Sequence, residues 1–277
     1  MRNRLLGFSL LCLFFAPSWA QAAGTCERLV ATGNPEYPPY LWRDPQNPKL
    51  LIGANADLLK QIGEELGVKV EVLYTGTWAR AQKEVSSGRV DMLAGAFLTV
   101  PRLEVMDYVH PAFYNTTSVV WVQTGKGFEY LGPEDLREQV GGTVLNNSFG
   151  QSFDSFARAN LKLEEVPSLT QAFKKLLLGR TNYVLYELYP GLTIAEQLGI
   201  KNQLEVLQPP ISSEGLHFTL SHNSACNDPW LRGQLAKKMT ELQESGAAEQ
   251  LLERNLDLWR EQHVAKVGAA NEVEDKQ

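Results

Sequence analysis

Strand-like and helix-like segments alternate along most of this chain, and this alternation constrains its fold more than any other feature. Residues 29–32 and 68–73 are short apolar segments, as is typical of strands. Between them, Leu58, Leu59 and Ile62 recur at the spacing that places side chains on one face of a helix. The succession of strand, helix and strand predicts an α/β fold.

The remaining segments continue the alternation. Further strands are expected at residues 90–93, 106–109, 118–122, 143–145, 183–186, 204–207 and 216–220, and helices at 78–85, about 149–159, 191–198 and within 231–256. Asn55 and Ser168 precede apolar patterns of helical period and are expected to cap those two helices. From Arg260 onward the sequence is polar and aperiodic, so residues 260–277 are expected to form a disordered tail.

The N-terminus has the features of a secretory signal peptide. Two arginines, Arg2 and Arg4, precede an apolar stretch at residues 5–16, and Ala20 or Ala22 completes a small-x-small cleavage site. The alternatives are an uncleaved anchor or a lipoprotein modified at Cys26, but the residues before Cys26 do not match a lipidation motif. We therefore expect residues 1–22 to be removed and the mature protein to be periplasmic.

Charge and size limit the possible partners. Removing residues 1–22 takes away two arginines and no acid, so the formal net charge goes from −6 to −8. This negative charge argues against nucleic acid or an anionic membrane as partner. The mature chain of about 255 residues is long enough for one large or two ordinary α/β domains.

Few residues in the mature chain suggest metal or cofactor chemistry. Phosphate-binding, dinucleotide-binding, nucleophile-elbow and zinc-protease motifs are absent from the sequence, and we expect no cofactor and no metal. His217 and His222 are five residues apart near a predicted strand, so their side chains should point to opposite faces. Only Cys26 and Cys226 remain after cleavage, and they are either two free thiols or one disulfide.

Residues 88–111 form the segment that points most directly to a binding site. A short apolar strand leads into Gly95, which has no Cβ and therefore lets the backbone approach a ligand closely. Arg102 follows a polar turn, and its planar guanidinium suits a carboxylate held by two hydrogen bonds. A strand, a turn and a solvated arginine are the simpler interpretation of the same residues.

This segment resembles the A-G-x-x-x-T-x-x-R…V-D-F-S-x-P region of the family 3 periplasmic solute-binding proteins, and the resemblance extends over about residues 29–259. It implies the two-lobed type II periplasmic-binding-protein fold, with two α/β lobes joined by two crossing strands near residues 114–117 and 212–215. Lobe 1 would comprise residues 24–114 and 215–259, and lobe 2 residues 115–214. Both cysteines would then lie in lobe 1, which favours a disulfide between them.

The resemblance also implies roles for individual residues. Arg102 would bind the α-carboxylate of an amino-acid-like ligand, and Glu187 would receive its ammonium group. Tyr37, in the Tyr-Pro-Pro-Tyr motif, would stack on the ligand, and Trp78 would form part of the wall. From the residues alone, Tyr37 could equally pack its own loop and Glu187 could form an internal salt bridge.

Three positions depart from the family pattern. Asn147 replaces a glycine in the strand-to-helix turn of lobe 2, where Ser148 keeps one hydroxyl and Phe149 replaces the other. Phe97 stands where the family has serine or threonine. These changes remove hydroxyls and add aromatic surface, so the pocket is expected to differ from a plain amino-acid site while still including all four residues.

The resemblance favours a binding protein over an enzyme. It implies a monomer that captures a small-molecule solute and delivers it to an inner-membrane ABC permease. A more distant resemblance to periplasmic cyclohexadienyl dehydratases offers an alternative, in which Glu187 is a general acid. An orphan or sensory binding role without transport is the third possibility.

Overall fold

The computed structural model describes residues 26–274. The signal peptide predicted for residues 1–22 lies outside the described residues. Among the residues that are described, no helix combines the length and the apolar character needed to cross a bilayer.

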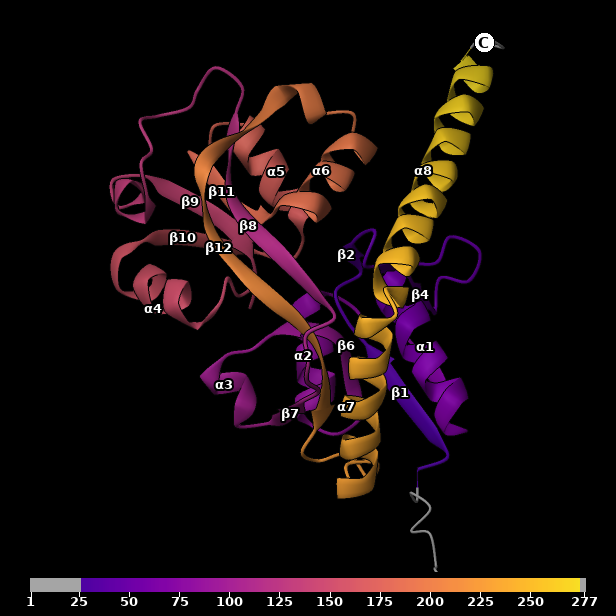
Figure 1. Cartoon of the computed structure of the whole chain (residues 1–277). Helices are drawn as coiled ribbons and strands as arrows, with labels where there is room; N and C mark the ends of the chain where they lie inside the picture. The colour runs from indigo at the N-terminus through magenta and orange to yellow at the C-terminus, as the bar shows by residue number, and fades with distance from the viewer. Residues whose placement is uncertain (1–25, 275–277) are drawn as a thin grey trace, which may run out of the picture.

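The molecule has two α/β lobes connected by one continuous mixed sheet, which confirms the predicted fold class (Figure 1). The sheet order is β10-β9-β11-β8-β12-β6-β1-β5, with β7 paired to β12. The strands are β1 (Arg28–Thr32), β5 (Lys69–Val72), β6 (Met92–Phe97), β7 (Met106–Tyr108), β8 (Tyr114–Gln123), β9 (Val140–Val144), β10 (Lys162–Val166), β11 (Tyr183–Glu187) and β12 (Leu204–Ser221). A second, three-stranded sheet contains β2 (Glu36–Tyr37), β3 (Leu41–Arg43) and β4 (Leu51–Ile52).

Helices flank the sheet in each lobe (Figure 1). The lobe with both ends of the described chain contains α1 (Ala54–Leu66), α2 (Trp78–Ser86), α3 (Val100–Leu103), α7 (Pro229–Glu244) and α8 (Ala247–Glu274). The other lobe contains α4 (Gln151–Asn160), α5 (Leu169–Leu177) and α6 (Leu188–Gln197), with short 3₁₀ turns at Pro133–Leu136 and Lys201–Gln203. We refer to these as lobe 1 and lobe 2.

Two long strands connect the lobes. β8 and β12 run antiparallel, and their register pairs Ser213 with Thr117 and Leu216 with Tyr114. β12 continues into lobe 1, where it pairs with β6, and β8 pairs with β11 in lobe 2. The sequence predicts two separate strands at 204–207 and 216–220, but β12 is one strand of 18 residues that changes register between Leu207 and Ser212. Residues 208–215, between the two apolar segments, include two prolines and several polar residues, so the sequence does not predict a continuous strand there.

The core explains why the apolar segments become buried elements. All five residues of β11 are buried, as expected for a central strand covered on both faces. β10, which the sequence analysis missed, is an edge strand with mostly exposed residues and therefore lacks a continuous apolar signal. Asn55 does not cap α1, because the helix begins one residue earlier and the Asn55 amide donates to Ala94 O at 2.6 Å.

The C-terminal segment differs from the prediction. α8 continues as one helix to Glu274 and extends beyond the body of lobe 1 (Figure 1), where the sequence analysis expects a disordered tail from Arg260. Residues 260–274 contain no proline and are rich in alanine and glutamate, which favour helix even without an apolar period. At the start of this segment, Trp42 Nε1 donates to Gln262 Oε1 at 3.0 Å.

A disulfide joins Cys26 and Cys226, as the resemblance implies. Cys26 lies just before β1, and Cys226 lies between β12 and α7. The bond therefore joins the segment before β1 to the segment between β12 and α7.

Candidate ligand-binding site

A cavity of about 360 Å³, including its mouth, lies where the two lobes meet. The lining residues are Asn34, Tyr37, Leu41, Asn55, Trp78, Ala94, Gly95, Ala96, Phe97, Arg102, Asn147, Ser148, Glu187 and Leu216. Eight of the nine residues that the sequence analysis proposed for the site are in this set, and Phe149 is not.

Arg102 is buried in the wall that lobe 1 contributes. It belongs to the short helix α3, and only 9% of its surface is exposed. Its Nη1 donates to Phe97 O at 2.9 Å, and its Nη2 donates to Gln82 Oε1 at 3.2 Å and to Asn146 O at 3.5 Å. These bonds, together with a contact to the Tyr108 hydroxyl, hold the plane of the guanidinium. The Trp78 ring lies 5.5 Å from the guanidinium carbon.

Glu187 is the corresponding charged residue of lobe 2. It ends β11 and begins α6, and it is only 2% exposed. Its Oε2 atom has no hydrogen-bond partner among the described residues. Burial raises the pKa of Glu187 to about 7, while its own backbone N–H, the nearby Asn147 amide and the charge of Arg102 lower it in part. A buried carboxylate that lacks a cationic partner is costly, so an incoming cation would be strongly favoured here.

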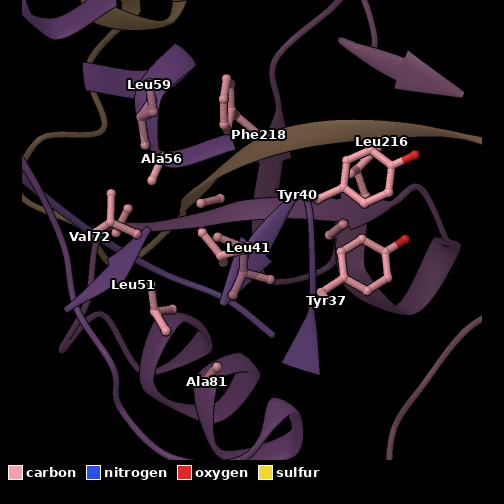
Figure 2. Packing of buried hydrophobic residues seen from close by; sticks show 14 of the residues in the cluster. Tyr37, Tyr40, Leu41, Leu51, Ala56, Leu59, Val72, Ala81, Leu216 and Phe218 are labelled. Atoms are coloured by element: carbon pink, nitrogen blue, oxygen red, sulfur yellow. The ribbon is translucent and has the colours of Figure 1, made fainter. Parts of the chain in front are cut away.

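Other polar atoms in the cavity wall are also unsatisfied. Among the described residues, the Tyr37 hydroxyl, Trp78 Nε1 and Asn55 Oδ1 are buried without a hydrogen-bond partner. Each such group costs about 1–3 kcal/mol unless a ligand or water satisfies it. Figure 2 shows the Tyr37 and Tyr40 rings next to each other, with both hydroxyls pointing away from Leu41. The wall therefore combines aromatic surface with polar atoms that need partners.

Asn55 is a site residue that the sequence analysis missed. Its position before an apolar helical pattern predicted a helix cap, and this local interpretation concealed its role in the cavity wall. An ideal Cβ on Gly95 would lie 2.7 Å from Asn55 Nδ2, and the φ of Gly95 is +135°. Glycine is therefore needed at position 95 for both backbone conformation and space.

The turn before α4 differs from the prediction. The Ser148 hydroxyl donates to the Asp154 carboxylate and accepts from Gly150 N at 3.2 Å, so both its functions are used within lobe 2. Phe149 packs against Phe153, with 5.7 Å between ring centroids, in the lobe 2 core. Phe149 therefore stabilises lobe 2 instead of forming part of the aromatic wall. Phe97 and Trp78 do line the cavity.

Hydrogen bonds cross between the lobes on both sides of the cavity. The Glu36 carboxylate of lobe 1 accepts from Leu169 N at 2.9 Å and from Thr170 N at 3.4 Å, at the start of α5 in lobe 2. Burial raises the pKa of Glu36, although these hydrogen bonds offset part of the effect. On the other side, Gln82 Nε2 donates to Asn146 O at 3.1 Å. The lobes are thus in contact around the cavity, in a closed arrangement.

The family model for bacterial extracellular solute-binding proteins, family 3, matches residues 29–257. The chain belongs to this family. Comparison with curated protein sequences gives no match. The assignment confirms the resemblance found in residues 88–111.

Several solved structures share the fold of this protein. An arginine-binding protein mutant from T. maritima superposes with a TM-score of 0.69 at 19% identity, covering 83% of this chain and 96% of that one. An amino acid ABC transporter substrate-binding protein, AbpA from Streptococcus pneumoniae bound to L-arginine, gives 0.69 at 20% identity, covering 84% and 96%. A histidine kinase sensor domain similar to periplasmic binding proteins gives 0.70 at 21%, covering 83% and 96%. These neighbours establish the two-lobed fold of this family 3 protein.

Neither His217 nor His222 lines this cavity. Within the described residues, no group of three or more histidine, cysteine, aspartate or glutamate side chains could hold a metal ion. His217 is buried, with Nδ1 3.0 Å from Val109 O, and His222 lies 3.5 Å from Asp107. The two histidines have separate partners.

Proposed function

We propose that this protein captures a small solute bearing a carboxylate and an amine between its two lobes and delivers it to an ABC importer. Lobe closure over the solute is the general hinge mechanism of periplasmic binding proteins. The observation that carries the proposal is the pair of buried, oppositely charged side chains, Arg102 from lobe 1 and Glu187 from lobe 2, in one cavity. In this proposal the carboxylate binds the Arg102 guanidinium, and the ammonium group binds Glu187.

The charge balance of the cavity supports a zwitterionic ligand. Binding of an ammonium group near Glu187 would favour the ionised carboxylate and so offset the effect of burial on its pKa. A neutral sugar would satisfy neither Glu187 nor Arg102. Among the structural neighbours, one protein is bound to L-arginine, and an ancestral arginine-binding protein is bound to arginine in one structure and to glutamine in another.

An experiment on Arg102 tests the proposal. A thermal-shift screen of the purified mature protein against L-amino acids identifies stabilising ligands, since a ligand at 100 times its Kd adds about 2.7 kcal/mol. Calorimetry then compares the wild type with Arg102→Ala and with the control Arg158→Ala, which removes an exposed arginine from α4. We expect Arg102→Ala to abolish binding and Arg158→Ala to retain it, with circular dichroism unchanged in both.

Retention of wild-type affinity by Arg102→Ala would overturn the proposed role of the arginine. Glu187, with its pKa near 7, also meets one requirement of a general acid. Incubation with prephenate or arogenate tests this enzymatic alternative, and formation of a dehydrated product would replace the binding proposal with it.

A further inference from the structure

The charges of the cavity wall limit which side chain a bound amino acid can carry. Of the 14 lining residues, only Arg102 and Glu187 are ionisable to charged forms near neutral pH. In the proposed function, on which this inference rests, these two residues bind the α-carboxylate and the α-ammonium group. A further charge on the ligand would then be enclosed without a counter-ion.

Other acidic groups near the cavity are already engaged. Glu36 faces an adjoining groove, where its Oε2 accepts from the first two backbone N–H groups of α5. The carboxylate of Asp154 accepts from the Ser148 hydroxyl and from Phe149 N. A lysine or arginine side chain of the ligand would have to displace one of these contacts to gain a partner.

Other basic groups near the cavity lie outside it. Arg80 and Lys83 line a groove on the outer side of Arg102, and neither contributes to the cavity wall. The Arg80 side chain is 69% exposed, with Nε 3.7 Å from Glu84 Oε1. An acidic ligand side chain would therefore find no second cation within the cavity.

The uncharged part of the wall suits a neutral side chain. Leu41, Phe97 and Leu216 provide apolar surface. Asn55 adds a polar atom in a fixed orientation, because its Nδ2 is bound to Ala94 O and its Oδ1 remains unpartnered. Desolvating a ligand charge against such a wall costs far more than desolvating an amide, a hydroxyl or a methyl group.

We propose that the cavity selects α-amino acids with uncharged side chains and excludes arginine, lysine and the acidic amino acids. The wall residues from both lobes cause this selectivity, because they supply one cation and one anion and no third charge. The protein would therefore differ in specificity from the arginine-bound neighbours that share its fold.

A matched pair of asparagine variants tests this cause directly. Asn34 lines the cavity, with its Oδ1 accepting from Glu36 N at 3.0 Å and its Nδ2 donating to the Tyr186 hydroxyl at 2.8 Å. In Asn34→Asp one carboxylate oxygen keeps the first bond. The Tyr186 hydroxyl, which donates to Glu36 O at 3.2 Å, can turn to donate to the other oxygen instead. The variant adds a negative charge to the wall at nearly constant volume. Asn202→Asp, on the surface, adds the same charge elsewhere.

Calorimetry with L-glutamine, L-serine, L-leucine, L-arginine and L-glutamate provides the measurement. We expect the wild type to bind at least one of the neutral amino acids at least 100-fold more tightly than L-arginine or L-glutamate. We expect Asn34→Asp to lower, at least tenfold, the ratio of the Kd for L-arginine to the Kd for the tightest-binding neutral amino acid. We expect Asn202→Asp to leave this ratio unchanged.

The outcomes separate this inference from the function on which it rests. Binding of L-arginine or L-glutamate by the wild type as tightly as any neutral amino acid, with dependence on Arg102, would overturn the inference and keep the proposed function. An unchanged ratio of these Kd values in Asn34→Asp would also overturn the inference, because the charge of the cavity wall would then not be the reason that L-arginine is excluded. No binding of any of the five would contradict the proposed function, and this inference with it.

Discussion

Replacing Glu36 with alanine is expected to weaken ligand binding by disfavouring the closed arrangement of the lobes. The first three backbone N–H groups of α5 have different acceptors. Leu169 N and Thr170 N donate to Glu36 of lobe 1, whereas Gln171 N donates to the Ser168 hydroxyl of lobe 2 itself. Glu36 therefore caps this helix only when the lobes are together.

The magnitude follows from the two backbone groups that lose their acceptor. In the closed form of Glu36→Ala, Leu169 N and Thr170 N lose the carboxylate, while in an open form water solvates them. Loss of a helix cap costs about 0.5–2 kcal/mol. Because burial raises the pKa of Glu36, part of the gain from these bonds is already offset by desolvation. We therefore expect about 0.5–2 kcal/mol, or a two- to thirtyfold decrease in the closure equilibrium.

Ligand affinity and hydrogen exchange report this change separately. If tight binding requires closure, the apparent Kd should rise by up to the same two- to thirtyfold factor. Without ligand, the amides of Leu169 and Thr170 should exchange faster in Glu36→Ala. Small-angle X-ray scattering should show a larger radius of gyration for the ligand-free variant.

Two controls distinguish closure from general destabilisation. Ser168→Ala removes the cap that lies within lobe 2, so it should lower the thermal stability of both open and closed forms with little effect on affinity. Glu129→Ala removes an exposed carboxylate remote from this contact and should change neither property. Wild-type affinity together with wild-type exchange at Leu169 and Thr170 in Glu36→Ala would refute the reasoning.

Three further predictions concern buried groups. Because burial raises the pKa of Glu187 from 4.5 to about 7, the ligand-free protein should lose stability as pH rises from 4.5 to 7, by at most about 3 kcal/mol. Glu187→Gln should flatten this slope in thermal melts and weaken amino-acid binding; an unchanged slope would contradict the pKa shift. Reducing the Cys26–Cys226 bond should destabilise the protein in urea titrations by up to about 5 kcal/mol, given a sequence separation of 200 residues, and an unchanged midpoint would argue against the bond. Gly95→Ala should lower the melting temperature and the ligand affinity together, because position 95 has a positive φ and no room for a Cβ; wild-type values for both would contradict this.

The sequence by itself predicted the alternating elements and most of the cavity wall. The period of the apolar residues distinguishes a helix from a strand, and it also shows which face of the segment is buried. Arg102, Gly95 and Glu187 could be predicted from the sequence, because each lies at or after a recognisable strand and at the spacing found in the family. All three line the cavity.

Only the tertiary structure decided which partners the polar side chains have. Ser148 lines the cavity, but its hydroxyl donates to the Asp154 carboxylate six residues later. Asn55 has the sequence context of a helix cap, yet its amide binds a carbonyl 39 residues away. Phe149 was expected to line the ligand pocket, but it packs in the lobe 2 core.

The cross-lobe contact of Glu36 is the clearest case. Its acceptor atoms meet N–H groups more than 130 residues later in the chain, and nothing in the local sequence marks either partner. Local patterns encode hydrophobic burial, because burial depends on the periodicity of neighbouring residues. A hydrogen bond between lobes depends on the relative placement of two separate units, which only the folded chain defines.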